Sequence, residues 1–130
     1  MSEDFKELVS TLKRFRIKET IRDEHELENK LEHYLKEKRF IIQRQKSVTR
    51  KIRNDLVCII GEKKICLELK KFTDISIVQQ LDKYIPLYPD GLILICWKCS
   101  QSLRDVFRDV KKQITIPLEL VELRRYQPIF

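Results

Sequence analysis

The sequence contains few glycines and prolines and no long hydrophobic run. Its 130 residues include 2 glycines and 4 prolines, which excludes collagen-like and low-complexity chains. The longest apolar run, Leu92 to Trp97, is far shorter than the roughly 20 residues that a membrane-spanning helix needs. The first residues, Met1 to Lys6, include two acids and no apolar signal core. We therefore expect a protein that is neither secreted nor inserted in a membrane.

Acidic residues are outnumbered by basic ones. The chain has 20 Asp and Glu against 27 Lys and Arg, which gives a formal net charge of +7. Its hydrophobic fraction of 42% is too high for a disordered polyelectrolyte, and its length fits one domain with a single core. The positive charge favours a polyanionic partner, nucleic acid first of all.

Cysteine is scarce, and none of the four cysteines indicates a metal site. Buried small hydrophobic side chains are the ordinary role of such residues inside cells. Cys96 and Cys99 form a CxxC pattern, but a zinc site needs four ligands, and the sequence has no second CxxC and no histidine pair nearby. A disulfide and a metal role remain alternatives for this pair. Cys58 and Cys66 lie on opposite faces of a predicted hairpin, so we expect no disulfide between them.

Hydrophobic periodicity predicts the element order α, α, β, β, β, α, β, α, β, an α/β domain with a mixed sheet. Helix caps are expected at Thr20, at Thr73 or Asp74, and at Ser102, and Pro86 should end the third helix. The predicted helices span residues 3–15, 21–38, about 75–85 and about 103–110, and the predicted strands span 40–42, 56–60, 65–70, 92–97 and 114–123.

Three charged residues stand on the hairpin formed by the strands at 56–60 and 65–70. Side chains alternate along a strand, so Glu68 and Lys70 share one face. A turn of two or four residues between the strands places Asp55 on that same face. Charges within otherwise apolar strands need a partner or a metal ion, although solvent-facing alternation is the simpler alternative.

The predicted second helix adds an acid to this set. At 100° per residue, Glu24 and Glu28 fall within the apolar stripe of leucines that includes Leu27 and Leu31. Acids in that stripe are not on the solvated face of the helix. Either glutamate is a candidate, with Glu28 preferred; the alternative is that a glutamate at the edge of the stripe reaches solvent.

Asp55, twelve intervening residues and then Glu68-Leu69-Lys70 resemble the PD-(D/E)XK nuclease superfamily. The resemblance covers residues 20–123, although Asn54 stands where proline is usual. It implies a restriction-endonuclease-like αβββαβ core, with a mixed central sheet flanked by helices. Residues 1–19 would add an N-terminal helix and residues 124–130 a tail, which makes residues 1–130 a single nuclease domain.

Two further motifs refine the resemblance. Glu28-Asn29-Lys30-Leu31, with Phe40 opening the next strand, is similar to archaeal Holliday-junction resolvases. Gln80 to Tyr84 is similar to the QxxxY motif of RecB-type nucleases. The resemblance therefore implies a cytoplasmic, nucleoid-associated DNA endonuclease that depends on Mg²⁺, with Mn²⁺ as a substitute, and that acts on branched DNA in recombination.

The resemblance also implies a role for each site residue. Asp55, Glu68 and the backbone carbonyl of Leu69 would bind Mg²⁺, which prefers oxygen ligands. Glu28 would hold a metal-bound water or a second ion. The remaining roles fall to Lys70, which would orient or help deprotonate the attacking water, and to Gln80 (or Gln79), which would hydrogen-bond near Lys70 or to a DNA phosphate.

Basic residues outside the acid pocket are expected to contact DNA phosphates, which gives affinity without sequence specificity. The predicted contacts are Arg44, Lys46, Arg50, Lys51, Arg53 and Lys71. A second group on the fourth helix is either a further DNA contact or a solvated face, and we favour the solvated face: Arg104, Arg108, Lys111 and Lys112.

Cleavage of both strands requires two sites related by a two-fold axis, so we expect a homodimer. The N-terminal helix or the apolar end of the chain, residues 126–130, would pair the subunits, unless each packs on its own domain. Two other functions remain open from the sequence: a restriction-type or end-directed nuclease of the same fold, and a non-catalytic nucleic-acid-binding module.

Overall fold

The computed structural model describes residues 3–18, 20–44, 56–73 and 77–126. The element order matches the predicted order of helices and strands. In chain order, the elements are α1 (Glu3–Lys13), α2 (Glu24–Glu37), β1 (Ile41–Gln43), β2 (Leu56–Ile60), β3 (Lys63–Thr73), α3 (Ile77–Tyr84), the 3₁₀ turn η1 (Ile85–Leu87), β4 (Leu92–Cys99), α4 (Gln101–Gln113), β5 (Leu118–Glu122) and the 3₁₀ turn η2 (Leu123–Tyr126).

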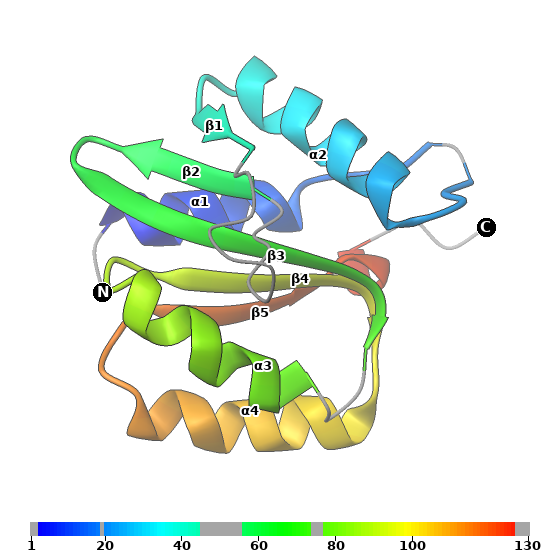
Figure 1. The fold of residues 1–130 in the computed structure, drawn as a ribbon. Coiled ribbons are helices and arrows are strands. Elements are labelled where there is room, and N and C mark those ends of the chain that lie inside the picture. Colours follow the sequence, from blue (N-terminus) through cyan, green and yellow to red (C-terminus); the bar gives the residue numbers. More distant parts are fainter. Residues whose placement is uncertain (1–2, 19, 45–55, 74–76, 127–130) are drawn as a thin grey trace.

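The five strands form one mixed sheet in the order β1-β2-β3-β4-β5 (Figure 1). The pairs β1–β2 and β2–β3 are antiparallel, whereas β3–β4 and β4–β5 are parallel. Helix α3 provides the crossover between β3 and β4, and α4 provides the crossover between β4 and β5. The predicted mixed α/β architecture is confirmed.

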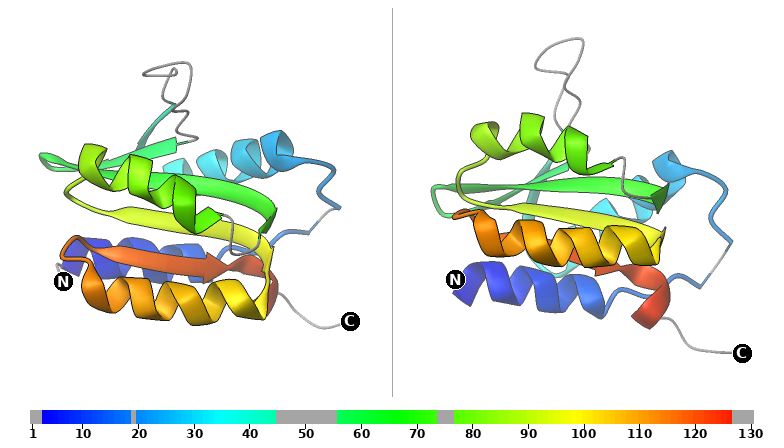
Figure 2. Two further views of the ribbon diagram at one scale, coloured as in Figure 1. Left: turned by 60° about the horizontal axis from the view of Figure 1, so that its bottom comes forward. Right: turned by 90° about the horizontal axis from the view of Figure 1, so that it is seen from below.

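Helices cover both faces of the sheet, and each face has its own hydrophobic cluster (Figure 2). The leucines of α1 and α2 pack on the face that carries Leu67 and Leu69 of β3. Side chains of α3 and α4 pack on the other face, which carries Cys66. Neighbours along β3 therefore belong to different clusters, as strand alternation requires.

The hairpin shows the predicted boundaries of its first strand and the shorter of the two predicted turn lengths. The strand Leu56–Ile60 is confirmed, but the loop consists of Gly61 and Glu62 because β3 begins at Lys63. Gly61 has a φ of 62°, a left-handed conformation that glycine adopts without a steric penalty.

Two predicted helix caps are wrong. Helix α2 starts after Asp23, whose carboxylate accepts a hydrogen bond from the backbone N–H of Glu26 at 2.8 Å, so Thr20 is not its cap. Helix α4 starts after Ser100, whose hydroxyl accepts from the N–H of Leu103, so Ser102 is not its cap. In both cases, another good capping residue competes with the predicted one, and sequence spacing alone does not rank them.

Proline explains two other boundaries. Helix α3 ends at Tyr84 because the residue before Pro86 is disfavoured in helical conformation, as predicted. Strand β5 begins at Leu118 rather than Ile114, because Pro117 has no N–H for the sheet. Thr73, one of two predicted caps of the third helix, belongs to β3, and Asp74 lies outside the described residues.

Helix α1 packs on its own domain. Its apolar side chains Phe5, Leu8 and Leu12 are fully buried in the cluster shared with α2 and the sheet. This packing is the alternative left open by the sequence, and it leaves α1 no apolar stripe with which to pair subunits. Of residues 126–130, the structure describes the backbone of Tyr126 alone. None of the helices in the described segments has the length and apolar character needed to span a bilayer.

Candidate active site

A buried carboxylate marks the middle of the sheet. Glu68 is 2% exposed, and Lys70 Nζ lies 3.5 Å from its Oε1. The Lys70 side chain keeps 29% of its surface exposed, so this ion pair lies at the boundary between core and solvent. Desolvating a carboxylate costs several kcal/mol even when it is paired, and acids are rarely buried to this degree. Such an acid, between the buried residues Leu67 and Leu69 of β3, is a candidate for a functional role.

The segment Glu68-Leu69-Lys70, called the ExK segment below, lies on the strand that pairs antiparallel with β2 on one side and parallel with β4 on the other. Strand β2 begins at Leu56, which pairs with Leu67. Beyond Leu67, β3 continues alongside β4, with Lys70 opposite Cys96. The ExK segment therefore lies in the half of β3 toward its carboxyl end, and carboxyl ends of parallel strands are the usual place for ligands in α/β folds.

Several predicted site residues lie outside the described parts of the structure. Asp55 and four of the predicted DNA contacts fall within residues 45–55. Gln80 belongs to α3 and Lys71 to β3, but the structure describes the backbone of these two residues alone. Of the predicted acids, the structure therefore places Glu28 and Glu68.

Glu28 lies on α2, in a network centred on Arg44. The guanidinium Nη1 of Arg44 is 3.1 Å from Glu28 Oε1, and its Nε is 2.5 Å from Glu32 Oε1. Arg44 also donates a hydrogen bond to the side chain of Asn29. Glu28 is 16% exposed, whereas Glu24 is exposed. Glu28 is thus the less exposed of the two glutamates that are candidates for the helix acid.

The network changes the electrostatics of α2. A hydrogen bond from Lys36 lowers the pKa of Glu32; burial opposes this shift, and Arg44 adds to it. Arg44, predicted as a DNA contact, here offsets the charge of two acids. The sequence did not reveal this network. It forms because Arg44, just after β1, lies beside α2 in the folded chain, and no local sequence pattern encodes this contact.

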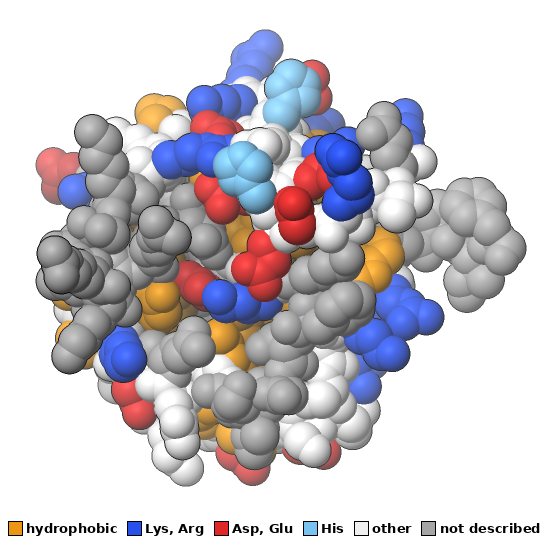
Figure 3. Space-filling view, turned by 45° about the vertical axis from the view of Figure 1, so that its right-hand side comes forward, with side chains coloured by type: hydrophobic (Ala, Val, Ile, Leu, Met, Phe, Trp, Pro, Cys, Tyr) orange, Lys and Arg blue, Asp and Glu red, His pale blue; other side chains and the backbone are white. Residues whose placement is uncertain are grey.

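The acids and histidines of α2 gather on one face of the molecule (Figure 3). Both histidines of the chain, His25 and His33, belong to α2, so they mark that helix in the view. Beneath them, acidic and basic side chains lie next to hydrophobic ones in a hollow of the surface. Among the described residues, which do not include Asp55, no group of three or more His, Cys, Asp or Glu side chains is arranged to hold a metal ion.

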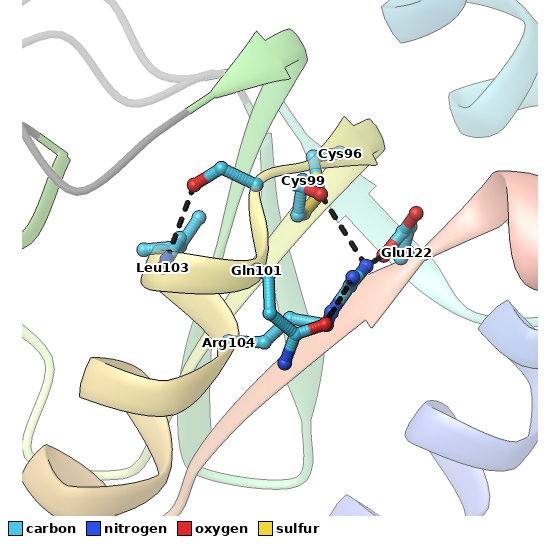
Figure 4. Close-up of a disulfide and its surroundings, with 7 residues drawn as sticks. Cys96, Cys99, Gln101, Leu103, Arg104 and Glu122 are labelled. Atoms are coloured by element: carbon cyan, nitrogen blue, oxygen red, sulfur yellow. Dashed lines mark hydrogen bonds and ion pairs between the residues drawn. A yellow bond between two sulfur atoms is a disulfide. The ribbon is translucent and has the colours of Figure 1, made fainter.

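A disulfide joins Cys96 to Cys99 at the end of β4 (Figure 4). It lies next to the ExK segment, because Cys96 pairs with Lys70 across the sheet. Cys58 and Cys66 are not joined by a disulfide and are buried in different clusters, which confirms the predicted opposite faces. Burial raises the pKa of the Cys58 thiol to about 12.

These features define a mixed α/β fold with a buried acid–lysine pair on β3, beside the parallel half of the sheet. The fold is similar to that of a repair endonuclease from Pyrococcus abyssi, with a TM-score of 0.59 and 16% sequence identity. The match covers 82% of this chain and 49% of that chain, so this chain spans about half of the endonuclease's length. No family model matches the sequence. A search of curated proteins likewise gave no match.

Proposed function

We propose that the protein is a metal-dependent DNA endonuclease of the PD-(D/E)XK type. The observation that carries this proposal is the ExK segment itself: a 2% exposed carboxylate with a lysine ammonium 3.5 Å away, on the same face of one strand. A strand that served packing alone would place apolar residues at these positions. The similarity of the fold to a repair endonuclease supports the same reading.

Asp55 completes the proposed carboxylate pair. It directly precedes Leu56 in the chain, so their Cα atoms are about 3.8 Å apart. Leu56 pairs with Leu67, the neighbour of Glu68. If the antiparallel register continued by one residue, Asp55 would stand opposite Glu68 and on its face.

The donor set fits Mg²⁺ or Mn²⁺. These ions prefer carboxylate and carbonyl oxygens, which Glu68, Asp55 and the backbone of Leu69 supply. In the proposal, Glu28 holds a water or a second ion beside them. When bound, the ion supplies positive charge that stabilises the pentavalent phosphate of the transition state.

Lys70 is proposed as the catalytic residue that acts on the attacking water and offsets the charge of the phosphate. Its ammonium is partly exposed, so it can reach a water or a phosphate oxygen without leaving Glu68. In the proposed mechanism, the Lys70 ammonium orients the attacking water and offsets the charge of the cleaved phosphate; if Lys70 instead accepts the proton of that water, it must first be a neutral amine. Gln80 of α3 would hydrogen-bond near it.

The net charge of +7 and the name of the structural neighbour support DNA as the substrate. Specificity for branched DNA and a homodimer are further proposals that rest on the resolvase-like motif. Cleavage of a matched panel of duplex, single-stranded, flap and four-way-junction DNA tests the first of these. Light scattering at micromolar protein tests the second, because a monomeric mass would remove the dimer.

Mutation of the acids tests the proposal. Asp55→Asn and Glu68→Gln should each abolish Mg²⁺-dependent cleavage while the circular dichroism spectrum keeps its native form. Each substitution removes a metal ligand and its charge but almost no volume. Arg124→Gln, which alters an exposed residue of η2, provides a folded control that should still cleave. Turnover at the wild-type rate in either acid variant would refute the site. Failure of the wild-type protein to cut any DNA, with Mg²⁺ or with Mn²⁺, would refute the proposed function.

A further inference from the structure

A groove lined by basic side chains lies between α4 and the edge strand β5, apart from the ExK segment. It encloses about 280 Å³. Its polar lining is contributed by α4, β5 and η2, and this set is called the basic groove below: Gln101, Arg104, Arg108, Lys111, Glu119 and Arg125. Four cations thus face one carboxylate.

Helical spacing gathers the α4 members on one side of the helix. Residues 101, 104, 108 and 111 recur at intervals of three or four, so their side chains form one row along α4. Leu103 and Phe107 form the adjacent buried stripe that packs on the sheet. The row therefore lies at the margin between core and solvent, where long basic side chains lie over the edge of the sheet.

Arg104 is held rigidly in the groove (Figure 4). Its Nη1 lies 2.5 Å from Glu122 Oε2 and donates to the carbonyl of Cys99 at 3.3 Å, and its Nη2 donates to Gln101 Oε1 at 2.6 Å. Glu122 is 8% exposed, so this pair is partly desolvated. Its Nε also donates to Gln101 Oε1, so most of the N–H donors of Arg104 are used within the protein. Arg104 therefore fixes the wall of the groove, and the other cations are the ones that can reach a phosphate.

The other cations supply charge at the mouth of the groove. Lys111 Nζ pairs with Glu119 at 2.7 Å, and Arg108 makes a looser pair with Asp105 at 3.4 Å. Arg125 is exposed and has no ion pair among the described residues. Even when the carboxylates paired to these cations are counted, the groove keeps an excess of positive charge.

The sheet relates the groove to the candidate active site. Lys70 pairs with Cys96, and Cys96 pairs with Glu122, the partner of Arg104. Two strand spacings of about 4.8 Å separate the backbones of Lys70 and Glu122, which places them about 10 Å apart.

We propose that the basic groove binds the phosphate backbone of the DNA substrate, outside the candidate active site. This inference rests on the proposed function, which supplies DNA as the substrate. It adds a second DNA-binding site, apart from the candidate active site. The groove is too small and too open to enclose a nucleotide, whereas a row of basic side chains suits successive phosphates. Of the two alternatives that the sequence left open for this side of α4, the proposal takes the further DNA contact rather than the favoured solvated face.

The test measures binding without cleavage. Fluorescence anisotropy of a labelled duplex of about 20 base pairs, in EDTA, gives Kd as a function of salt. The double variant Arg108→Gln/Arg125→Gln removes two exposed cations from the groove and leaves the Arg104 network intact. The control Lys6→Gln/Lys64→Gln removes the same charge at exposed positions outside the groove. Thermal melts confirm that both variants are folded.

If the groove binds DNA, the groove variant lowers the slope of log Kd against log salt by about 2 and raises Kd by at least about tenfold at 0.1 M salt, because two phosphate contacts are lost. The control changes Kd by less than about threefold through net charge alone. Equal effects of the two variants would overturn the inference, and so would the absence of DNA binding by the wild-type protein. The proposed function fails separately, when protein that binds DNA does not cut it with Mg²⁺.

Discussion

Replacement of Glu68 by glutamine should remove activity without loss of stability. At an effective dielectric constant of about 20, an ion pair at the observed 3.5 Å contributes about 5 kcal/mol of Coulomb energy. The desolvation of a 2% exposed carboxylate costs a similar amount, so the net contribution of the pair is near zero. Lys70 is 29% exposed and stays hydrated after the change. We therefore expect the free energy of unfolding of Glu68→Gln to be unchanged or higher by up to about 2 kcal/mol.

Glu122 provides the matched control, because its carboxylate is buried to a similar degree but belongs to an ion pair outside the ExK segment. It is 8% exposed and lies 2.5 Å from the guanidinium of Arg104. Glu122→Gln loses a charge-assisted hydrogen bond of 2.5 Å, a closer contact than the 3.5 Å between Lys70 and Glu68. The expected loss is about 2 kcal/mol, which corresponds to a Tm lower by roughly 8 °C for a chain of this length.

Urea unfolding followed by circular dichroism, at pH 7 in EDTA, measures both variants. The same preparations are assayed for plasmid nicking with Mg²⁺. A loss of more than about 2 kcal/mol in Glu68→Gln would show that this acid is a structural ion-pair partner like Glu122. In that case the burial of Glu68 would not indicate a metal site.

Three further predictions concern a core leucine, a buried thiol and the disulfide. Leu31→Ala, at a fully buried position of α2, should lower the free energy of unfolding by about 2 to 5 kcal/mol in urea titrations; a loss below about 1 kcal/mol would contradict the packing of α2 on the sheet. Cys58 should resist iodoacetamide at pH 8 until the protein is unfolded, because a pKa of about 12 leaves about one thiol in ten thousand ionised; rapid labelling of the native protein would show that it is exposed. Reduction of the disulfide between Cys96 and Cys99 should lower the free energy of unfolding by at most about 2 kcal/mol, because the closed loop is short, and four free thiols in unreduced protein would exclude the bond.

The sequence predicts the fold well where hydrophobic patterns are dense. The run Leu56–Ile60 has no polar residue, and its boundaries match the structure. Either predicted turn length places Cys58 and Cys66 on opposite faces, because side chains alternate along each strand, so this feature was predictable. Helix starts were less so, since Asp23 and Thr20 are both good caps and tertiary packing decides between them.

The candidate site was partly predictable for the same reason. The shared face of Glu68 and Lys70 follows from strand geometry, and the structure shows these two side chains in contact. The pairing of Arg44 with Glu28 joins residues far apart in the sequence, on a strand end and a helix. It depends on how α2 crosses the sheet, which no local periodicity encodes.

Nicking of supercoiled plasmid by wild-type protein and by Glu68→Gln, each with Mg²⁺ and with EDTA, tests the central claim most directly. We expect nicked circles for the wild-type protein with Mg²⁺ alone, and no product for the variant or for either protein in EDTA. Equal nicking by the wild-type protein and a folded Glu68→Gln variant, or cleavage that persists in EDTA, would contradict it.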